Sequence, residues 1–416
     1  MARAISATSA VPAMPGSPSR RGAPPVLWRA DLRAFALVAP LMIFMLSAFL
    51  YPICIMLFTA VDNGLTSTQL TKTSVVLDDW DGDRLPPAAV YPALAADLKS
   101  ADEAGYLAKM ATELNYRLSG FRSLMLKTQH GLAAGTTADQ QGFVQLDPRW
   151  NDTRFWKILQ RSSARLTSAN LLASLDLESK EDGGIGKVPE NRRVYLTYLY
   201  RTLVVSLSVT GLTLVIGYVI AFAIAQAQGR MARILLILVL LPFWTSLLVR
   251  TAAWVVILQR QGMLNEVMMW LGMVQEPIQL VFNRFGVLIG MTHVLLPFAV
   301  LPIHSVMKGI KPSQLNAASS LGARPFRAFA TVYLPQTMPG VIAGGLLVFV
   351  LANGFYITPA LLGGASDQLI SSLIADLALE RANWGMSSAL AIVLFVTIVA
   401  VLIVFGRFVK VREVRI

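Results

Sequence analysis

The stretch Asn316-Ala-Ala-Ser-Ser-Leu-Gly322, followed by Val332-Tyr-Leu-Pro335, decides the fold of this 416-residue chain. It lies between two apolar runs, each long enough to cross a bilayer. The small side chains of Ala317 and Ala318 let another protein surface approach the backbone closely, and Gly322 permits a sharp turn. The pattern predicts a short polar helix that ends at a glycine between two membrane spans.

The composition of the chain is that of a membrane protein. Apolar residues make up 55% of it and charged residues only 14%, whereas soluble domains carry about a quarter charged residues. A membrane-spanning helix needs about 20 consecutive apolar residues. Six segments meet this requirement: Ala34–Val61, Thr202–Ala225, Ile234–Val249 with its continuation to Leu258, Phe285–Met307, Gly340–Leu362 and Met386–Phe405. We predict an all-α membrane protein with six transmembrane helices.

The distribution of basic residues predicts the orientation of these spans. The N-terminal arm, the 226–233 link, the 308–330 loop and the C-terminal tail together carry 15 Lys and Arg residues against two acidic ones. Cytoplasmic loops are enriched in Lys and Arg, so we expect both termini and the 308–330 loop in the cytoplasm. The net charge of +12 is spread over these short segments. Nucleic-acid binding is disfavoured, because it would require one folded basic face.

We divide the chain into four parts. Residues 1–30 are predicted to be a disordered cytoplasmic arm, rich in Ala, Ser, Pro, Gly and Arg, with a transit peptide as the less favoured interpretation. Residues 31–61 form the first transmembrane helix, a run too long for a signal peptide, which we interpret as a retained anchor. Residues 62–190 form an insert between the first two spans. Residues 191–416 form a core of five further helices with a cytoplasmic loop at 308–335.

The insert has the composition of a water-exposed domain. It holds 17 of the 24 acidic residues and 14 of the 36 basic residues. Apolar residues recur near a 3.6-residue period over Ala95–Lys127, which predicts one long amphipathic helix. Asn151-Asp-Thr is expected to cap a second helix, and Thr167–Leu177 is expected to form a third. We predict a mainly helical domain on the periplasmic side of the membrane.

The sequence offers no catalytic or metal-binding constellation in the insert. His130 is its only histidine, and the single cysteine of the chain, Cys54, lies in the first span. Paired His or carboxylate spacings of the kind that metals require are missing from the sequence of this segment. We predict neither a metal site nor a cofactor, and we expect the insert to have a structural or docking role.

The stretch around Gly322 resembles the EAA loop of binding-protein-dependent ABC importers. Two adjacent alanines are followed after three residues by a glycine. After nine more residues come an aliphatic residue, one further residue and Leu-Pro. This spacing matches that of the EAA loop, although Asn316 replaces the leading glutamate. We expect Ser313 to be the helix N-cap and Asn316 to be the third helical residue, where it would replace a capping-box Glu only weakly. The resemblance implies that this helix seats in a cleft of a cytoplasmic ATPase. The coupling residues would then be Ser313, Asn316, Ala317, Ala318, Gly322, Leu334 and Pro335. The alternative is an ordinary interfacial helix that places Arg324 and Arg327 at lipid headgroups.

A second segment, Leu241-Pro-Phe-Trp-Thr-Ser-Leu-Leu-Val-Arg-Thr-Ala-Ala-Trp254, resembles the spermidine/putrescine permease family. Gly262, Asn265, Leu361-Leu-Gly-Gly364 and Asn383-Trp384 continue that pattern. The resemblance covers residues 200–416 and the first span, but not the insert. It implies the type I permease architecture of an ABC importer in the bacterial inner membrane, with polyamines as the solutes. The implied partners are a homologous permease subunit, cytoplasmic ATP-binding subunits and a periplasmic solute-binding protein.

Polar residues within the spans are candidates for the translocation pathway: Trp244, Arg250, Trp254, His293, Asn353, Tyr356 and Thr358. Arg250 either faces the pathway and pairs with an anion or, as we favour, snorkels outward or pairs with an acidic residue such as Glu266. His293 is expected to be neutral and bonded to backbone freed by nearby prolines. Asn353, Tyr356 and Thr358 either line a polar path or form interhelical hydrogen bonds.

The sequence has no Walker A motif, so we expect ATP hydrolysis in partner subunits and no enzymatic activity in this chain. An importer of another small polar solute, such as an opine, an amino-acid-like compound or an aminophosphonate, is the main alternative. A secondary transporter or a receptor is disfavoured. A secondary carrier would carry inverted repeats and midplane carboxylates, and a receptor would require a larger cytoplasmic segment.

Overall fold

The computed structural model describes residues 38–179 and 184–413. The predicted arm, residues 1–30, and the first residues of the predicted first span therefore lie outside the described residues. Residues 56–416 form one unit by their contacts, and residues 38–55 are described by themselves. The helix Val38–Val61 contains a π-helical turn, Leu46–Leu50, followed by α2, Tyr51–Val61.

The insert folds as a set of short helices followed by a small hairpin. The helices of its first part are α3 (Gly64–Gln69), α4 (Thr71–Leu77), α5 (Val90–Glu103), α6 (Leu107–Arg117), α7 (Phe121–Ala133), α8 (Gln140–Leu146), η2 (Pro148–Asn151) and α9 (Thr153–Ser163). They are followed by α10 (Ala169–Ser174), the antiparallel strands β1 (Leu177–Ser179) and β2 (Ile185–Lys187), and η3 (Glu190–Arg192).

The prediction of one helix over Ala95–Lys127 is wrong. The segment is divided among α5, α6 and α7 because Gly105 and Gly120 adopt positive φ values of 74° and 93°, which end a helix and redirect the chain. Apolar periodicity persists across these breaks since all three helices face the same core. The predicted cap is confirmed, with the Asp152 carboxylate accepting from the Arg154 amide at 2.9 Å.

Aromatic residues form the centre of the insert. Tyr91, Phe143, Trp150 and Trp156 are buried, and their rings lie 4.8–5.4 Å apart between centroids. The indole Nε1 of Trp150 donates to Thr128 Oγ1 at 2.8 Å, and that of Trp156 donates to the Trp150 carbonyl at 2.9 Å. Both buried indole donors are therefore satisfied within the insert.

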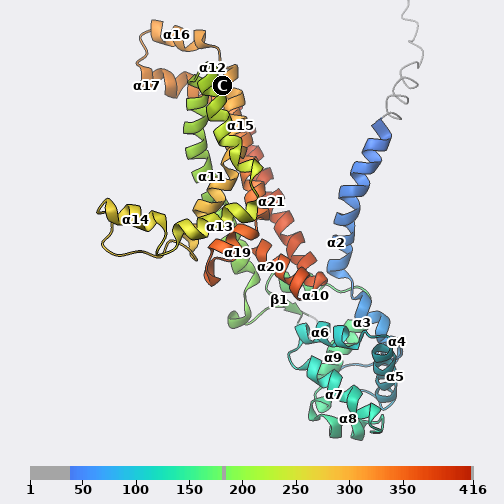
Figure 1. The fold of residues 1–416 in the computed structure, drawn as a ribbon. Helices are drawn as coiled ribbons and strands as arrows, with labels where there is room; N and C mark the ends of the chain where they lie inside the picture. The colour runs from blue at the N-terminus through green and yellow to red at the C-terminus, as the bar shows by residue number, and fades with distance from the viewer. Residues whose placement is uncertain (1–37, 180–183, 414–416) are drawn as a thin grey trace, which may run out of the picture. The chain divides into compact units, whose positions relative to one another are not determined.

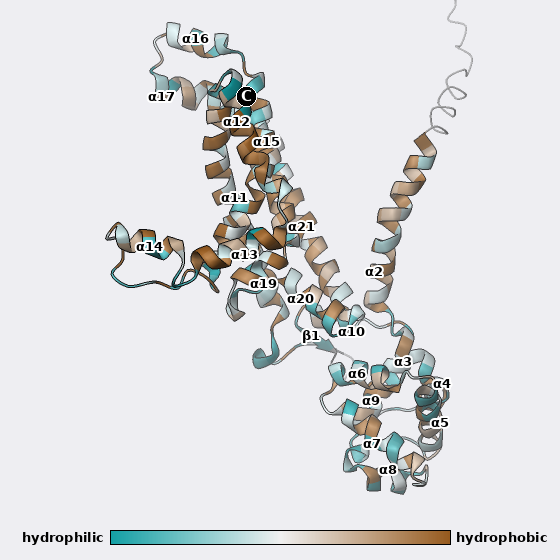
Figure 2. Ribbon diagram, viewed as in Figure 1, coloured by the Kyte–Doolittle hydropathy of each residue, from teal (hydrophilic) through white to brown (hydrophobic). Residues whose placement is uncertain are grey.

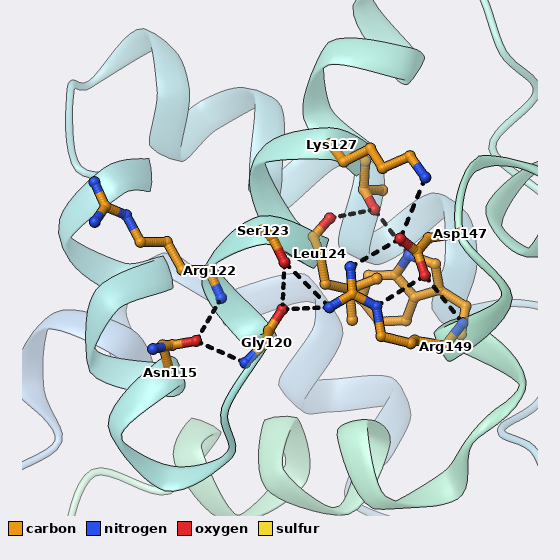
Figure 3. A network of polar contacts seen from close by, with 10 residues as sticks. Asn115, Gly120, Arg122, Ser123, Leu124, Lys127, Asp147 and Arg149 are labelled. Atoms are coloured by element: carbon orange, nitrogen blue, oxygen red, sulfur yellow. Dashed lines mark hydrogen bonds and ion pairs between the residues drawn. The ribbon is translucent and has the colours of Figure 1, made fainter.

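A polar network joins α7 to the η2 turn at the surface of the insert (Figure 3). The Asp147 carboxylate accepts from Arg149 Nε and Nη2 at 2.9 and 2.8 Å, and Lys127 Nζ lies 3.3 Å away. Arg149 Nη1 also donates to the Gly120 carbonyl at 2.7 Å. The hydrogen bonds from Arg149 hold the pKa of the Asp147 carboxyl well below its usual range.

The remaining helices form the bundle. They are α11 (Tyr195–Gln226), α12 (Gly229–Leu240), η4 (Leu241–Trp244), α13 (Leu247–Leu258), α14 (Met263–Trp270), α15 (Arg284–Gly309), α16 (Pro312–Ser320), α17 (Pro325–Ala328), η5 (Phe329–Tyr333), α18 (Leu334–Gly354), α19 (Ile357–Leu362), η6 (Ala365–Asp367), α20 (Ile370–Ala375), η7 (Asp376–Glu380) and α21 (Trp384–Glu413). Apolar residues dominate its long helices, whereas the insert helices mix polar and apolar positions (Figure 2).

The predicted all-α membrane fold is confirmed. Five described helices are long and apolar enough to cross a membrane, and a bent pair makes a sixth candidate. This pair, Gly229–Trp244 with Leu247–Trp270, bends by 100°, so the prediction of one continuous span from Ile234 to Leu258 is wrong. The break follows Pro242, where Thr245 and Ser246 are extended. The predicted fifth span, Gly340–Leu362, is also shifted: the helix covers Pro325–Gly354.

Helices α11, α15 and α18 lie side by side at the centre of the bundle (Figure 1). Small residues allow this contact, as is common where helices pack in membranes. A Cβ atom on Gly340 would lie 2.9 Å from the Pro302 carbonyl oxygen, and one on Gly217 would lie 3.2 Å from the Ala299 Cβ. Helices α15 and α18 therefore touch backbone to backbone at Gly340, and α11 packs closely on a small side chain at Gly217, so neither place has room for a larger side chain.

The last part of the insert connects the ends of three spans. Asn170 on α10 donates to the Ala60 carbonyl at 3.3 Å, and α10 also packs against α21. Asp176, which is buried, accepts from the amides of Val194, Tyr195 and Leu196 at 2.9–3.2 Å. It thereby supplies acceptors for the free amides that begin α11.

Candidate functional site

Helix α16 is the exposed helix that the sequence predicts, but it begins two residues earlier than expected. Lys311 occupies the N-cap position and makes no side-chain capping bond, and Pro312 is the first helical residue. The predicted cap at Ser313 is therefore wrong. A proline is favoured at the first helical position because its missing amide would have no partner there. Asn316 becomes the fifth helical residue, so the capping-box argument for it is also wrong.

The predicted turn at Gly322 is confirmed. This glycine has φ +84°, its amide donates to the Ser319 carbonyl at 3.0 Å, and the Ala323 amide donates to the Ala318 carbonyl at 3.0 Å. The two bonds form a Schellman motif, which ends α16 and satisfies its last carbonyls. Only glycine adopts this backbone conformation without a steric cost.

The loop returns to the bundle at a cluster of packed aromatic side chains, which we call the aromatic base. Tyr333 is buried and stacks on Phe329 at 5.7 Å, and Phe222 on α11 meets both rings edge-on. Leu334 is half-buried and begins α18, whereas Pro335 is exposed. The base fixes the end of the loop to α11.

The outer surface of the loop is apolar in part. None of the α16 residues is buried, and Asn316 and Ala317 are exposed while Ala318 is half-buried. Leu321 and Phe326 are 90% and 82% exposed. Helices α16 and α17 lie at the end of the bundle where α11 ends and α12 begins (Figure 1). Apolar residues at such exposure beside a polar helix are typical of a protein contact surface.

A second group of polar residues lies inside the bundle, between α13, α15 and α19. Trp254 Nε1 donates to His293 Nδ1 at 3.2 Å, and the rings are 5.6 Å apart. The predicted backbone partner for His293 is wrong, since a side chain from α13 takes that place. Thr358 is buried, and its hydroxyl lies 3.3 Å from that of Thr251. The second bond joins α19 to α13.

The other predicted pathway residues are arranged differently. Asn353 is buried, and its Nδ2 donates to the Phe349 carbonyl at 2.7 Å while its Oδ1 has no partner. Trp244 and Tyr356 are 76% and 42% exposed. Arg250 forms no ion pair with Glu266 in the described structure, and its Nε and Nη1 atoms are buried without hydrogen-bond partners. Trp254 with His293, and Thr251 with Thr358, are thus the joined pairs.

Three structural roles were not anticipated. Asn265 is buried and holds the loop after α14, through bonds of 2.9–3.1 Å to Gln259 and Ile278. Asp367 is buried and accepts from Arg284 Nε at 3.3 Å. Asp176 caps α11 as described above. A polar residue in a short loop next to a span is the signal that could have indicated these roles, because free helix-end amides and loop carbonyls require partners.

Residues 199–413 match the family model described as binding-protein-dependent transport system inner membrane component. The chain belongs to this family. It is 36% identical over 214 residues to the spermidine/putrescine transport system permease protein PotB of Escherichia coli (strain K12), covering 51% of this chain and 78% of that protein. The PotB protein of Haemophilus influenzae is 37% identical over 214 residues, with 51% and 75% covered. The molybdenum transport system permease protein ModB of Mycobacterium bovis is 27% identical over 197 residues, with 47% and 72% covered.

These matches confirm an ABC importer permease, a multi-pass protein of the inner membrane. Members of the family are membrane subunits and not themselves enzymes, and they work with ATP-binding subunits and a periplasmic binding protein. The matched range leaves out the insert. Within the described residues no group of three or more His, Cys, Asp or Glu residues could hold a metal ion.

Proposed function

We propose that this chain forms one half of the solute pathway of an ABC importer for polyamines such as spermidine or putrescine. The observation that carries the proposal is the 36–37% identity to two PotB proteins over three quarters of their length. The loop 308–335 and the chain termini lie in the cytoplasm, as the basic residues around the spans favour. The insert then lies on the periplasmic side.

The solute is the least constrained part of this proposal. The more distant ModB relative is named for molybdenum transport, so family membership alone does not determine the cargo. Among the candidate spans of the described residues, only the bent pair contains an acidic residue, Glu266, which is exposed on α14. Cation recognition would then lie in the binding protein, the partner permease or polar groups such as Asn353. Mass spectrometry of the small molecule bound to the cognate binding protein tests the assignment, and an opine, amino acid or aminophosphonate would replace it.

We propose that polar groups of α13, α15, α18 and α19 line the pathway. Asn353 Oδ1 has no partner although the residue is buried, and the Trp254–His293 pair lies between two of these helices. The unpartnered Asn353 oxygen is an acceptor that suits an ammonium group that has lost its water, whereas a neutral His293 whose Nδ1 accepts from Trp254 has only its Nε2–H donor left. Asn353→Leu should lower uptake of labelled spermidine and leave the amount of assembled transporter unchanged.

We propose that α16 transmits ATPase movement to the bundle. Its exposed surface, its close-approach alanines and the rigid base at Tyr333 support this role. Gly322→Asp should abolish solute-stimulated ATPase activity in the reconstituted complex, because an L-residue at φ +84° costs about 1–2 kcal/mol and the added carboxylate faces the ATPase. Gly309→Asp is the matched control, since it adds the same charge to the same loop where no atom is within 4 Å. Normal stimulation in Gly322→Asp would mean that α16 is not the coupling element.

We propose that the insert docks the binding protein. Its mixed surface charge favours a wet, charged interface, which salt would weaken. The variant should replace only residues 64–163 by a Gly/Ser linker, so that α10 and Asp176 keep their contacts with Ala60 and α11. We expect normal membrane insertion and basal ATPase activity, but reduced stimulation by the loaded binding protein. Full transport by this variant would refute the docking role.

A further inference from the structure

A cavity of about 270 Å³ lies where the insert meets the bundle, within the unit formed by residues 56–416. On the insert side it is lined by α6 and the start of α7, with Lys109, Tyr116 and Arg122. On the bundle side it is lined by Arg381 and Ala382, in the turn between η7 and α21. The Tyr116 hydroxyl donates to the Arg381 carbonyl at 3.4 Å, so the two sides are in contact. Three separate segments thus each bring one cation to this cavity.

The acidic groups at the cavity are engaged by other residues. Glu113 also lines it, and its carboxylate accepts from the Thr66 hydroxyl at 2.6 Å. Arg381 is paired with the aspartate that begins η7, at 2.8 Å. Among the described residues, Lys109 and Arg122 have no acidic partner. The cavity therefore presents two cations that are free to bind an anion.

The cavity lies at the depth of lipid headgroups. Trp384 is the first residue of α21 and of a stretch, Trp384–Arg407, that is long and apolar enough to cross a membrane. Ala382 is two residues earlier, a distance of at most about 7 Å, and the polar layer on each side of the hydrocarbon core is about 5–8 Å thick. Trp384 and Tyr116 are 54% and 45% exposed, and Trp and Tyr side chains are enriched in this layer. A lipid phosphate in this layer is within reach of the cavity.

We propose that this cavity binds the phosphate-bearing headgroup of an anionic phospholipid, such as phosphatidylglycerol, through Lys109 and Arg122. An ammonium and a guanidinium both bind phosphate oxygens, and the guanidinium can donate two parallel hydrogen bonds. Basic pockets next to membrane helices bind anionic headgroups. Both leaflets carry phosphate groups, so the proposal holds whichever side of the membrane the insert occupies. The bound headgroup holds α6 and α7 of the insert against the turn that precedes α21.

The first test measures lipid binding by the full chain. The detergent-purified chain is titrated with phosphatidylglycerol, and native mass spectrometry gives the affinity of the first bound lipid. Lys109→Met combined with Arg122→Met should weaken this affinity by about 25-fold, because each basic residue at an anionic lipid surface contributes about fivefold. Lys72→Met combined with Lys99→Met is the matched control, since it removes two exposed lysines of α4 and α5 that do not line the cavity. An unchanged affinity in the first double variant, or an equal loss in the control, would overturn the proposal.

The second test locates the headgroup with both cations left in place. Ala108, an exposed residue that lines the cavity, is replaced by the photo-reactive residue p-benzoylphenylalanine, and the full chain is placed in lipid nanodiscs. Illumination should form an adduct with phosphatidylglycerol, and an excess of inorganic phosphate should not prevent it. Nanodiscs of phosphatidylcholine should give little adduct, because the choline group is itself a cation.

The other outcomes identify a different occupant. Loss of the adduct in inorganic phosphate would mean that the cavity takes free phosphate, and equal adducts with phosphatidylcholine would mean a contact with any lipid. Each result would overturn the proposal. If the Lys109 and Arg122 double variant binds phosphatidylglycerol normally but loses stimulation by the loaded binding protein, the two cations serve a protein contact. The lipid site is then wrong although the permease function stands.

Discussion

The insert and the bundle satisfy their buried polar groups in different ways. In the insert, Asp147 is paired with Arg149 and Lys127, and both buried indoles have acceptors in the same segment. In the bundle, Arg250 keeps two buried nitrogens without partners, and Asn353 keeps a buried oxygen without one. Unpaired buried groups are costly unless another molecule completes them. The insert also leaves buried oxygens of Asp62, Tyr91 and Gln129 without partners, so what distinguishes the bundle is that a cation, Arg250, is partly unpaired among apolar helices.

The two regions also differ in how they exclude solvent. The insert buries large aromatic side chains such as Trp150 and Trp156 against one another. The bundle brings helix backbones together at Gly340 and Gly344, and Gly217 packs closely on the Ala299 side chain. Lipid is as apolar as a leucine side chain, so packing contacts replace the hydrophobic effect as the force that holds membrane helices together. A larger side chain at a packed glycine of the bundle should therefore lower stability more than loss of a buried charge in the insert.

The largest expected effect tests the bundle. Gly340→Leu should destabilise the full chain by about 3 kcal/mol, because its Cβ would lie 2.9 Å from the Pro302 carbonyl oxygen and 3.0 Å from the Ile303 Cα. Backbone atoms cannot move aside as a flexible side chain can. The melting temperature of the detergent-purified chain, followed by size-exclusion chromatography, measures the loss.

Gly354→Leu is the control for this substitution. Gly354 ends the same helix, is exposed, and would place its Cβ with no atom within 4 Å. We expect little change in its melting temperature. Equal losses in both variants would show that leucine in α18 is harmful in general, and the backbone contact between α15 and α18 would not explain the effect.

The sequence predicted this bundle in outline but not its breaks. Apolar run length identifies spans because each must fill the membrane, and it located α11, α15 and α21 well. It could not show that the chain bends by 100° after Pro242, since the residues on both sides of the bend are apolar. In the insert, periodicity continued through Gly105 and Gly120, so three helices were predicted as one.

Of the candidate site, the sequence predicted the turn at Gly322 but not the contacts between helices or the helix cap. The turn at Gly322 depends on local backbone chemistry, which the sequence states directly. The bond between Trp254 and His293 depends on which residues of two separate helices meet, and spacing along the chain does not give this. The cap was misplaced because Ser313 is a good N-cap type, but Pro312 prefers the first helical position.

The second prediction tests the insert through pH. Hydrogen bonds from Arg149 lower the pKa of Asp147, and burial opposes them. A carboxyl with a depressed folded pKa stabilises the fold above its unfolded pKa of about 3.9 and loses that contribution as pH falls below it. Asp147→Asn should cost the insert about 2 kcal/mol at pH 7, with the difference from wild type shrinking below about pH 4. Hydrogen exchange of the α7 amides in the full chain measures this.

The control for the pH prediction is an ion pair of the same insert that water screens. Lys99 and Glu103 lie 4.0 Å apart with side chains 75% and 70% exposed. Glu103→Gln should leave α7 exchange unchanged at every pH, since exposed pairs contribute little. If Asp147→Asn had no effect at pH 7, or the same effect at pH 3, the polar network of Figure 3 would not stabilise the insert as the structure indicates.

The smallest expected effect concerns α16, the part of the bundle that we propose contacts the ATPase. Asn316 is the fifth residue of a nine-residue helix and is exposed. Asn316→Glu can therefore neither complete a capping box nor gain from the first helical turn, and Ser313 and Ser320 offer no charge partner three or four residues away. Glu is the better helix former by some tenths of a kcal/mol. We expect ATPase stimulation in the reconstituted complex to change less than about twofold, as such an energy implies.

A matched neutral variant separates charge from helix propensity at this position. Asn316→Gln gains most of the same propensity without the negative charge. If Glu raises stimulation and Gln does not, the ATPase cleft presents a basic group to this residue. If Glu abolishes assembly while Gln is tolerated, the cleft is acidic there, which would explain why this chain carries Asn where the EAA pattern has Glu. Either result would show that the ATPase presents a charged group to residue 316. Two unchanged variants would show that it does not.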